Sequence, residues 1–456
     1  MSFASPGAPT PARRVAYLNA RLLDPASGMD MAGQVLTEGG RIVDVGANLF
    51  PPDLFRDNAP DNAEAIDCKG MCLAPGLVDM RVQLREPGEE HMENMASASQ
   101  AAAAGGVTTM VALPNTQPVI DDVSLVEFVA RRTREIGVTR IRTYAAATKG
   151  LHGKELTELG LMAEAGAAGF TDGTKAIASA VVMRRALSYA RMFGKIIVQH
   201  PEEPALAGEG AMNEGEIASR LGLAGIPPAA EIMMVERDLR LVELTGGRYH
   251  AAHVSTGEAI DAIRKAKRQG LAVTCDTAPH YFALNETAVG DYRTFAKVSP
   301  PLRDEMDRRA VVEGLADGTI DAIASDHAPH DQEEKRLPFA QAAFGIIGLE
   351  TLLPLSLELV HNGHLKLLQA LGALSHRPAA ILGFEGGRLA RGAPADFVIF
   401  DPDKPDRIEE ARFRSKSKNS PFDGRPVQGA VLRTVMDGRT VFEAGAERAK
   451  RGGRGD

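Results

Sequence analysis

The sequence predicts an α/β protein: a closed, TIM-like (β/α)8 barrel with a small discontinuous β-sandwich domain built from both chain ends. Residues 73–384 alternate short apolar strands with amphipathic helices, which is the pattern of a parallel barrel. The flanking residues 14–72 and 385–445 carry short alternating strands and turn signals, and each segment is short for an independent domain. A length of 456 residues fits one large barrel and one satellite domain.

Each barrel strand is predicted from a short apolar run bounded by turn signals. The expected strands are residues 73–84, 107–113, 141–147, 168–172, 195–200, 249–255, 272–277 and 320–326. Apolar residues recur at helical spacing between these runs. The clearest expected helices are residues 93–104, 123–136, 181–193, 230–245 and 258–269.

The two flanking segments are expected to pair with each other. Residues 14–72 form the first part of the predicted β-sandwich and residues 385–445 form the second, which brings the chain ends together. Residues 1–13 are rich in Pro, Ala and Ser, and residues 446–456 are rich in Gly and Arg. Both are expected to be disordered tails.

Composition excludes several classes of partner. The formal net charge is −8 and no basic block stands out, so neither nucleic acid nor an anionic membrane is an expected partner. No run approaches 18 apolar residues, the length that a membrane-spanning helix needs. Cys68, Cys72 and Cys275 are the only thiols. This small, odd number favours a reducing, cytoplasmic location over a disulfide framework.

Polar residues gather where the predicted strands end. On the first strand, Asp79, Arg81, Gln83 and Arg85 alternate with apolar residues and would share one face. Such a polar face is costly unless it lines a site. Most of the other predicted strands also end on polar residues: Asn115, Asp172, His200, His253, His280, Asp326 and His330. Because barrel chemistry lies at the carboxyl ends of the strands, we predict a functional pocket on this face.

Several motifs occur in order along almost the whole chain, from about residue 14 to 445. They are Ala74-Pro75-Gly76-Leu77-Val78-Asp79, Leu84-Arg85-Glu86-Pro87-Gly88, Pro114-Asn115-Thr116, His253-Val254-Ser255-Thr256, Pro300-Pro301-Leu302-Arg303, Ser325-Asp326-His327-Ala328-Pro329-His330 and Ser415-Lys416-Ser417-Lys418-Asn419-Ser420-Pro421-Phe422. With these motifs the chain resembles the type I dihydroorotases. More broadly, it is similar to the cyclic amidohydrolases, which include allantoinases and dihydropyrimidinases.

The resemblance implies a catalytic centre that this sequence only partly keeps. The family hydrolyses or closes a cyclic amide with zinc-bound hydroxide, while an aspartate carries the proton. The implied metal residues are His200, His253 and Asp172, and the implied catalytic aspartate is Asp326. The family's first strand supplies a His-x-His pair, which Arg81 and Gln83 replace here.

Arginine has no lone pair for zinc, and glutamine is a poor zinc ligand compared with histidine. If the chain holds any metal, we expect it to be zinc, with the first-strand metal position lost.

The substrate-binding residues of the family are better kept. Arg85 matches the arginine that binds the substrate carboxylate, and Asn115 and His330 match its companions. The resemblance therefore implies a small-molecule ligand such as dihydroorotate or N-carbamoyl-L-aspartate, from de novo pyrimidine biosynthesis.

Three interpretations follow. In the first, Arg81 replaces the metal as a cation that satisfies both Asp172 and Asp326, and hydrolysis is weak or absent. Some relatives that lack the His pair are non-catalytic partners of aspartate carbamoyltransferase, so the resemblance implies a complex with that enzyme. We also expect a homo- or hetero-oligomer. The alternative is an active single-zinc dihydroorotase that uses His200, His253, Asp172 and Asp326. A further alternative is an allantoinase or hydantoinase-like hydrolase.

Residues 331–344 form either a lid or a surface loop.

Overall fold

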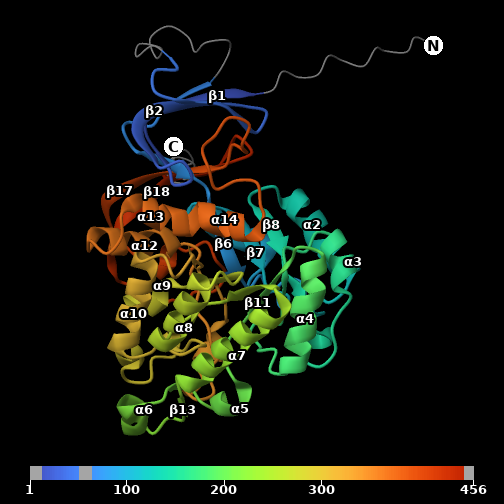
Figure 1. The fold of residues 1–456 in the computed structure, drawn as a ribbon. Helices are drawn as coiled ribbons and strands as arrows, with labels where there is room; N and C mark the ends of the chain where they lie inside the picture. The colour runs from blue at the N-terminus through green and yellow to red at the C-terminus, as the bar shows by residue number, and fades with distance from the viewer. Residues whose placement is uncertain (1–12, 51–63, 446–456) are drawn as a thin grey trace, which may run out of the picture.

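A computed structural model describes residues 13–50 and 64–445. A strand-rich unit made from both ends of the described chain packs against one end of a larger barrel of strands and helices (Figure 1). The predicted disordered tails, residues 1–13 and 446–456, lie outside the described residues except for Arg13.

The barrel is a ring of parallel strands. They are β6 (Leu77–Val82), β7 (Val107–Ala112), β8 (Arg140–Thr143) continued by β9 (Ala145–Ala146), β10 (Phe170–Thr171), β11 (Ile196–Gln199), β14 (Arg248–Ala251), β15 (Val273–Thr277) and β16 (Ala322–Ile323). A parallel bridge between Val82 and His327 closes the ring, and Gln83 N donates to His327 O across 2.8 Å. The predicted (β/α)8 barrel is confirmed.

Helices surround this ring (Figure 1). The longer ones are α1 (Met95–Ala104), α2 (Val123–Ile136), α4 (Ala180–Met192), α7 (Ala229–Thr245), α8 (Gly257–Arg268), α10 (Glu305–Ala316) and α12 (Leu352–His361). Shorter ones are α3 (Leu159–Glu164), α9 (Pro279–Ala283), α11 (Gln332–Lys335), α13 (Leu367–Leu371) and α14 (Arg377–Leu382). The predicted bounds of α2 match the structure. The side chain of Asp122 caps its first turn, and Gly137 ends it in the left-handed conformation.

An excursion between β11 and α7 was not predicted from the sequence. It contains α5 (Pro204–Ala207), β12 (Met212–Asn213), α6 (Glu216–Leu221) and β13 (Gly225–Ile226), and it lies at the end of the barrel away from the strand-rich unit (Figure 1). Its elements are too short to give a clear hydrophobic period.

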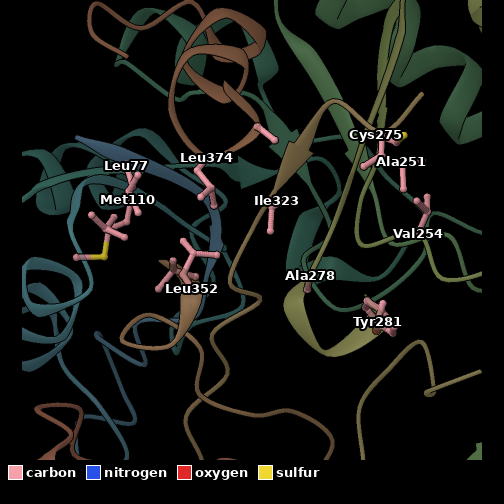
Figure 2. Packing of buried hydrophobic residues seen from close by; sticks show 14 of the residues in the cluster. Leu77, Met110, Ala251, Val254, Cys275, Ala278, Tyr281, Ile323, Leu352 and Leu374 are labelled. Atoms are coloured by element: carbon pink, nitrogen blue, oxygen red, sulfur yellow. The ribbon is translucent and has the colours of Figure 1, made fainter. Parts of the chain in front are cut away.

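The core lies between the ring and its helices. Leu77, Met110 and Ile323 from the strands pack in one cluster with Leu352 of α12 (Figure 2). The barrel strands are buried on both faces, which explains why most of their residues are apolar. In β6, Asp79 and Arg81 are the buried polar exceptions.

The strand-rich unit is the predicted sandwich. Its strands are β1 (Arg14–Asp24), β2 (Met29–Glu38), β3 (Arg41–Gly46), β4 (Glu64–Asp67), β5 (Cys72–Pro75), β17 (Phe397–Arg407), β18 (Pro426–Met436) and β19 (Arg439–Glu443). β5 pairs in parallel with β1 and antiparallel with β17, so one sheet joins the two ends of the described chain. The rings of Tyr17 and Phe397 meet edge to face, with centroids 4.7 Å apart. The predicted fold class is therefore confirmed, while its division at residues 72/73 and 384/385 stays a prediction.

The first predicted strand, residues 73–84, differs from the structure. It is split at Gly76 into β5, which belongs to the sandwich, and β6, which belongs to the barrel. A Cβ at Gly76 would lie 2.2 Å from Oγ1 of Thr108, so only glycine fits where the chain passes between the two sheets. β6 ends at Val82, and Arg85 has a φ of 59°. Alternation therefore stops before Gln83 and Arg85, and the expectation that they extend the strand was wrong.

In the described part of the chain, every helix is too short or too polar to cross a lipid bilayer. Cys68, Cys72 and Cys275 are buried free thiols.

Candidate functional site

Arg81 lies at the centre of the carboxyl end of the barrel. Its Nε donates to Oδ1 of Asp326 across 2.8 Å, and Nη2 donates to the carbonyl oxygen of Gly173 at 3.3 Å. The Arg81 side chain is 3% exposed and that of Asp326 is 12% exposed. Nη1 of Arg81 is buried without a partner among the described residues. The guanidinium is thus a buried cation with one free donor.

Asp172 follows β10 but does not meet Arg81 in an ion pair. Its Oδ1 accepts from Thr148 N at 2.9 Å, and its Oδ2 accepts from Thr148 Oγ1 at 2.5 Å. Burial raises the pKa of Asp172, against the hydrogen bonds from Thr148. The prediction that the guanidinium of Arg81 satisfies both aspartates is therefore wrong for Asp172. Thr148, two residues after β9, supplies that carboxylate with a hydroxyl and an amide instead.

His200 and His253 follow adjacent strands, β11 and β14, and their rings meet. Nδ1 of His200 lies 3.1 Å from Nε2 of His253. Burial, followed by the charge of Arg81, lowers the pKa of His253 well below its ordinary value. His253 is therefore neutral at pH 7. On the outer side of the pair, Ser299 Oγ lies 3.5 Å from Nε2 of His200 and donates to Glu202 Oε1 at 3.2 Å.

Two buried carboxylates hold the backbone around His253. Asp276 accepts from His253 N, and its other oxygen lies 3.0 Å from Nε2 of His250. Glu231 of α7 accepts from the backbone and hydroxyl groups of Ser255 and Thr256. These contacts hold the loop that carries His253 in place against β15 and α7.

His280 is a site residue that the sequence showed only as one strand end among several. Neither ring nitrogen has a hydrogen-bond partner among the described residues. Nε2 lies 3.9 Å from Oδ2 of Asp326. Burial lowers the pKa of His280 to about 4, against the effect of Asp326, so the ring is neutral at pH 7. The available signal was the Pro279-His280 pair directly after β15. The supporting role of Glu231 carried no such signal, because an acidic residue in the first turn of a helix is common and does not indicate a contact with a distant loop.

The predicted metal residues do not assemble as one donor set. The two imidazoles converge, but Asp172 is turned to Thr148 and Asp326 to Arg81. Within residues 13–50 and 64–445, no group of three or more His, Cys, Asp or Glu side chains is placed to hold a metal ion. Catalytic zinc sites use three protein ligands and a water. In this geometry the side chains do not fit that arrangement.

The predicted substrate residues lie in two neighbouring groups. Nη2 of Arg85 donates to Nε2 of His330 at 3.1 Å, and Nδ1 of His330 lies 2.6 Å from Glu334 Oε2. Burial, then Arg85, lowers the pKa of His330 to about 3, so a neutral ring accepts from Arg85 and donates to Glu334. Asn115 is separate from this group and donates to Gln83 Oε1 at 3.1 Å.

The guanidinium of Arg85 is engaged on every side. Besides His330, it donates to the carbonyl oxygen of Pro329 at 3.0 Å and to Glu89 Oε2 at 3.1 Å. The Glu89 side chain is 27% exposed, compared with 8% for Arg85. Glu89 is thus the partner that a carboxylate ligand would replace, since it can turn into solvent.

Three of these residues have strained backbones. Arg85, His253 and Asp326 have φ values of 59°, 39° and 50°, in the left-handed region that side chains with a Cβ rarely adopt. Each lies two or three residues after a barrel strand. Strained residues of this kind cluster at functional sites, where the surrounding structure holds them.

Residues 331–344 were expected to be a lid or a surface loop. Two buried lysines hydrogen bond to backbone carbonyl groups of this segment. Nζ of Lys335 donates to Ala343 O at 2.7 Å, and Nζ of Lys297 donates to Ala342 O at 2.8 Å. Burial lowers the pKa of Lys335 to about 7 and that of Lys297 to about 8. The segment begins beside His330, so its position is coupled to the Arg85 group.

Two family models match the chain, in agreement with this geometry. A dihydro-orotase-like model matches residues 70–259, and an amidohydrolase-family model matches residues 310–442. Among solved structures, the chain is similar to an L-hydantoinase (dihydropyrimidinase) from Arthrobacter aurescens. The TM-score is 0.82 at 26% identity, covering 94% of this chain and 96% of that one. A dihydropyrimidinase from Brevibacillus agri shares the fold, with a TM-score of 0.79 at 23% identity and coverage of 94% and 95%.

Curated relatives are more similar in sequence. A dihydroorotase from Anaplasma phagocytophilum is 48% identical over 94% of this chain and 95% of its own length. One from Ehrlichia chaffeensis is 45% identical over 94% of this chain and 95% of its own length. These matches span the barrel and both parts of the sandwich. The chain belongs to the dihydroorotase family.

Proposed function

We propose that this protein acts in de novo pyrimidine biosynthesis as a dihydroorotase-family member that binds dihydroorotate or N-carbamoyl-L-aspartate but has lost zinc-dependent hydrolysis. In this proposal it is a non-catalytic partner of aspartate carbamoyltransferase. The observation that carries the proposal is the ion pair between Arg81 and Asp326. It puts a fixed cation against the carboxylate that the family uses for proton transfer.

The first support is chemical. A guanidinium has no lone pair, so Arg81 cannot bind zinc. A metal ion a few ångströms away would also meet its positive charge, at a cost of several kcal/mol with an effective dielectric of about 20. Arg81 can polarise a carbonyl group through its free Nη1, but it cannot produce hydroxide from water near neutral pH.

The second support is the state of the remaining donors. Asp172 has both oxygens hydrogen bonded to Thr148. His200 and His253 are left as two imidazoles that contact each other. Two imidazoles beside a buried cation are fewer than the three protein ligands of a catalytic zinc site, which favours weak or absent metal binding. Metal analysis of the purified protein tests this step directly.

The third support concerns ligand binding. Arg85, which donates to the neutral ring of His330, is the cation of this group, and Arg81 adds a free Nη1 donor. A substrate carboxylate would replace Glu89 on Arg85 and gain a bidentate pair. We therefore propose Arg85, Asn115 and His330 as the ligand-binding residues. The matches to curated dihydroorotases favour dihydroorotate over a hydantoin or allantoin as ligand.

The turnover experiment compares wild type with Arg81→His/Gln83→His, which restores the family's His-x-His pair. After chelation and reconstitution with zinc, we expect wild type to show little zinc and no chelator-sensitive cyclisation of N-carbamoyl-L-aspartate. We expect the double variant to gain zinc. Arg240→His, which alters an exposed arginine of α7, is the matched control. Stoichiometric zinc and chelator-sensitive turnover in wild type would overturn the loss of hydrolysis and support a single-zinc enzyme.

Ligand binding is tested apart from turnover. Calorimetric titration of wild type with dihydroorotate should give saturable binding. Arg85→Ala should weaken it by about 10- to 100-fold, the range for hydrogen bonds between charged groups. An Arg85→Ala variant that binds like wild type would remove Arg85 from the proposal.

The partner proposal rests on the resemblance to non-catalytic relatives, and its test is physical association. The protein is co-expressed with the carbamoyltransferase of the same organism and run on a size-exclusion column with light scattering. Co-elution at a mass above that of either protein alone supports the complex. Separate elution rejects it, whatever the outcome of the turnover experiment.

A further inference from the structure

A large cavity lies at the amino ends of the barrel strands, on the face opposite the candidate site. Its volume is about 1090 Å³. The barrel wall comes from the starts of β7 and β8 and from the residues that precede β10 and β11. The other wall comes from the β2–β3 turn, the β18–β19 turn and the segment after α14. The cavity therefore lies between the barrel and the sandwich.

The lining is basic in a chain whose net charge is −8. Six basic side chains face two acidic ones: Arg13, Arg41, Arg140, Arg142, Lys195 and Arg439 against Glu385 and Asp437. Clefts lined by one sign of charge concentrate the field and attract counter-ions. This local reversal of charge marks the cavity as a site for an anion.

Both acidic side chains are already paired. Glu385 lies 3.2 Å from Nη1 of Arg41, and Asp437 lies 2.8 Å from Nη2 of Arg140. Arg140 also pairs with Asp396 at 2.5 Å. Arg13 pairs with Glu64 outside the cavity lining, so three of the six cations remain without compensation.

Three basic groups lack a carboxylate partner among the described residues: Arg142, Lys195 and Arg439. Arg142 lies over the ring of Phe384, with its Cζ 5.6 Å from the centroid. Lys195 donates one hydrogen bond, to Ala167 O at 2.7 Å. Burial lowers the pKa of Arg142, with a further effect of Arg140, and burial followed by Arg142 lowers that of Lys195. Their mutual repulsion is what a bound anion would relieve.

The size and chemistry of the cavity select the ligand class. Small-molecule sites have volumes of about 300–1,000 Å³, so this cavity has room for a ligand as large as a nucleotide. Guanidinium groups bind phosphate through two parallel hydrogen bonds. Leu382, Phe384 and Met436 add an apolar part to the wall.

We propose that this cavity binds a small molecule bearing a triphosphate group, with Arg142, Lys195 and Arg439 contacting phosphate oxygens. Such a ligand bridges the two units, because Arg142 and Lys195 belong to the barrel and Arg439 begins β19 of the sandwich. No residue of the cavity belongs to the candidate site, so the proposal stands apart from the proposed function.

The test is calorimetric titration of the full-length protein with ATP, UTP and inorganic tripolyphosphate in about 0.15 M salt, where exposed charges are largely screened. We expect saturable binding of all three. Arg142→Ala and Arg439→Ala should each weaken binding about tenfold, corresponding to about 1.4 kcal/mol. Arg142→Lys should have a smaller effect. Arg240→Ala, at an exposed arginine of α7, should bind like wild type.

The three ligands separate the possible sources of the phosphate groups. Equal affinities assign the site to inorganic polyphosphate chemistry, and tighter binding of ATP or UTP assigns it to nucleotides. Two results overturn the proposal. One is no detectable binding of any of the three. The other is equal weakening by Arg240→Ala and Arg142→Ala in variants that keep the wild-type circular dichroism spectrum.

Discussion

The guanidinium of Arg81 joins the first barrel strand to Asp326, three residues after the last one, through a 2.8 Å hydrogen bond between Nε and Oδ1. The contact closes the carboxyl end of the barrel with a buried ion pair. Family members with a His-x-His pair place a metal ion there. In the proposed function, Arg81 therefore supplies positive charge at this position as a fixed cation instead of a metal ion.

Breaking this ion pair should destabilise the protein strongly. Loss of one partner of a buried pair leaves an uncompensated charge and costs about 3–5 kcal/mol. Arg81→Met and Asp326→Asn should each show a cost of this order in urea denaturation. The double variant should cost less than the sum, because it leaves neither charge unpaired. Additive losses would mean that the two side chains do not interact in solution.

Glu231 should matter for stability although it touches no ligand. It is fully buried and accepts from the backbone and hydroxyl groups of Ser255 and Thr256. Glu231→Gln introduces an NH₂ group opposite these donors. We expect a loss of about 2–3 kcal/mol in the free energy of unfolding, the cost of unsatisfied buried donors. Glu236→Gln, at an exposed position of the same helix, should change stability little.

The buried carboxyl group of Asp79 should make the free energy of unfolding depend on pH below about 7. Burial raises its pKa from 3.8 to about 7, so the folded state binds an additional proton between these values. The contribution of this carboxyl to stability is then present at low pH and is lost as pH rises through about 7. Asp79→Asn keeps the acceptor for the amides of Arg81 and Ser325 without the charge. In urea titrations, its stability relative to wild type should increase from about pH 4.5 to pH 8. A constant difference would show that Asp79 is not protonated in the fold.

The buried amino group of Lys335 should make the stability of its segment, residues 331–344, depend on pH above about 7. Its pKa is lowered from 10.5 to about 7, so the unfolded segment binds the additional proton between these values. Docking of residues 331–344 should therefore strengthen as pH rises from about 7 towards 10. Lys297, Glu334 and His330 face the same region.

Hydrogen exchange at residues 331–344, corrected for the intrinsic rate at each pH, measures this docking. Protection should rise with pH in wild type and less steeply in Lys335→Met, which keeps the part that is due to Lys297. An equal slope in the two proteins would remove Lys335 as the cause.

Much of the fold could be predicted from the sequence because the barrel strands are buried on both faces. Their apolar runs stand out, and the helical spacing of apolar residues placed a helix at residues 123–136, the bounds of α2. The division of the first strand at Gly76 could not be predicted in the same way. It depends on the approach of Thr108, which only the packed sheets bring near.

The candidate site was predicted in place but not in detail. Strand ends located Arg81, His200, His253 and Asp326 on one face, and the structure brings them together. The pairing of Asp172 with Thr148 could not be read from sequence, because it depends on side-chain directions from two neighbouring strands. The same holds for Glu231, which contacts Ser255 and Thr256 from the first turn of α7. The hydrophobic periodicity of a sequence locates helices and strands, whereas these two contacts depend on side-chain rotamers.

The shared sheet of the sandwich has a consequence for synthesis on the ribosome. β5 is made early, but its antiparallel partner β17 follows only after the whole barrel. During translation the growing chain therefore presents β5 with an open edge, a place where strands from other chains can add. Completion of the last strands removes that edge. Chains that terminate before residue 397 should consequently aggregate, even when their barrel segment is intact.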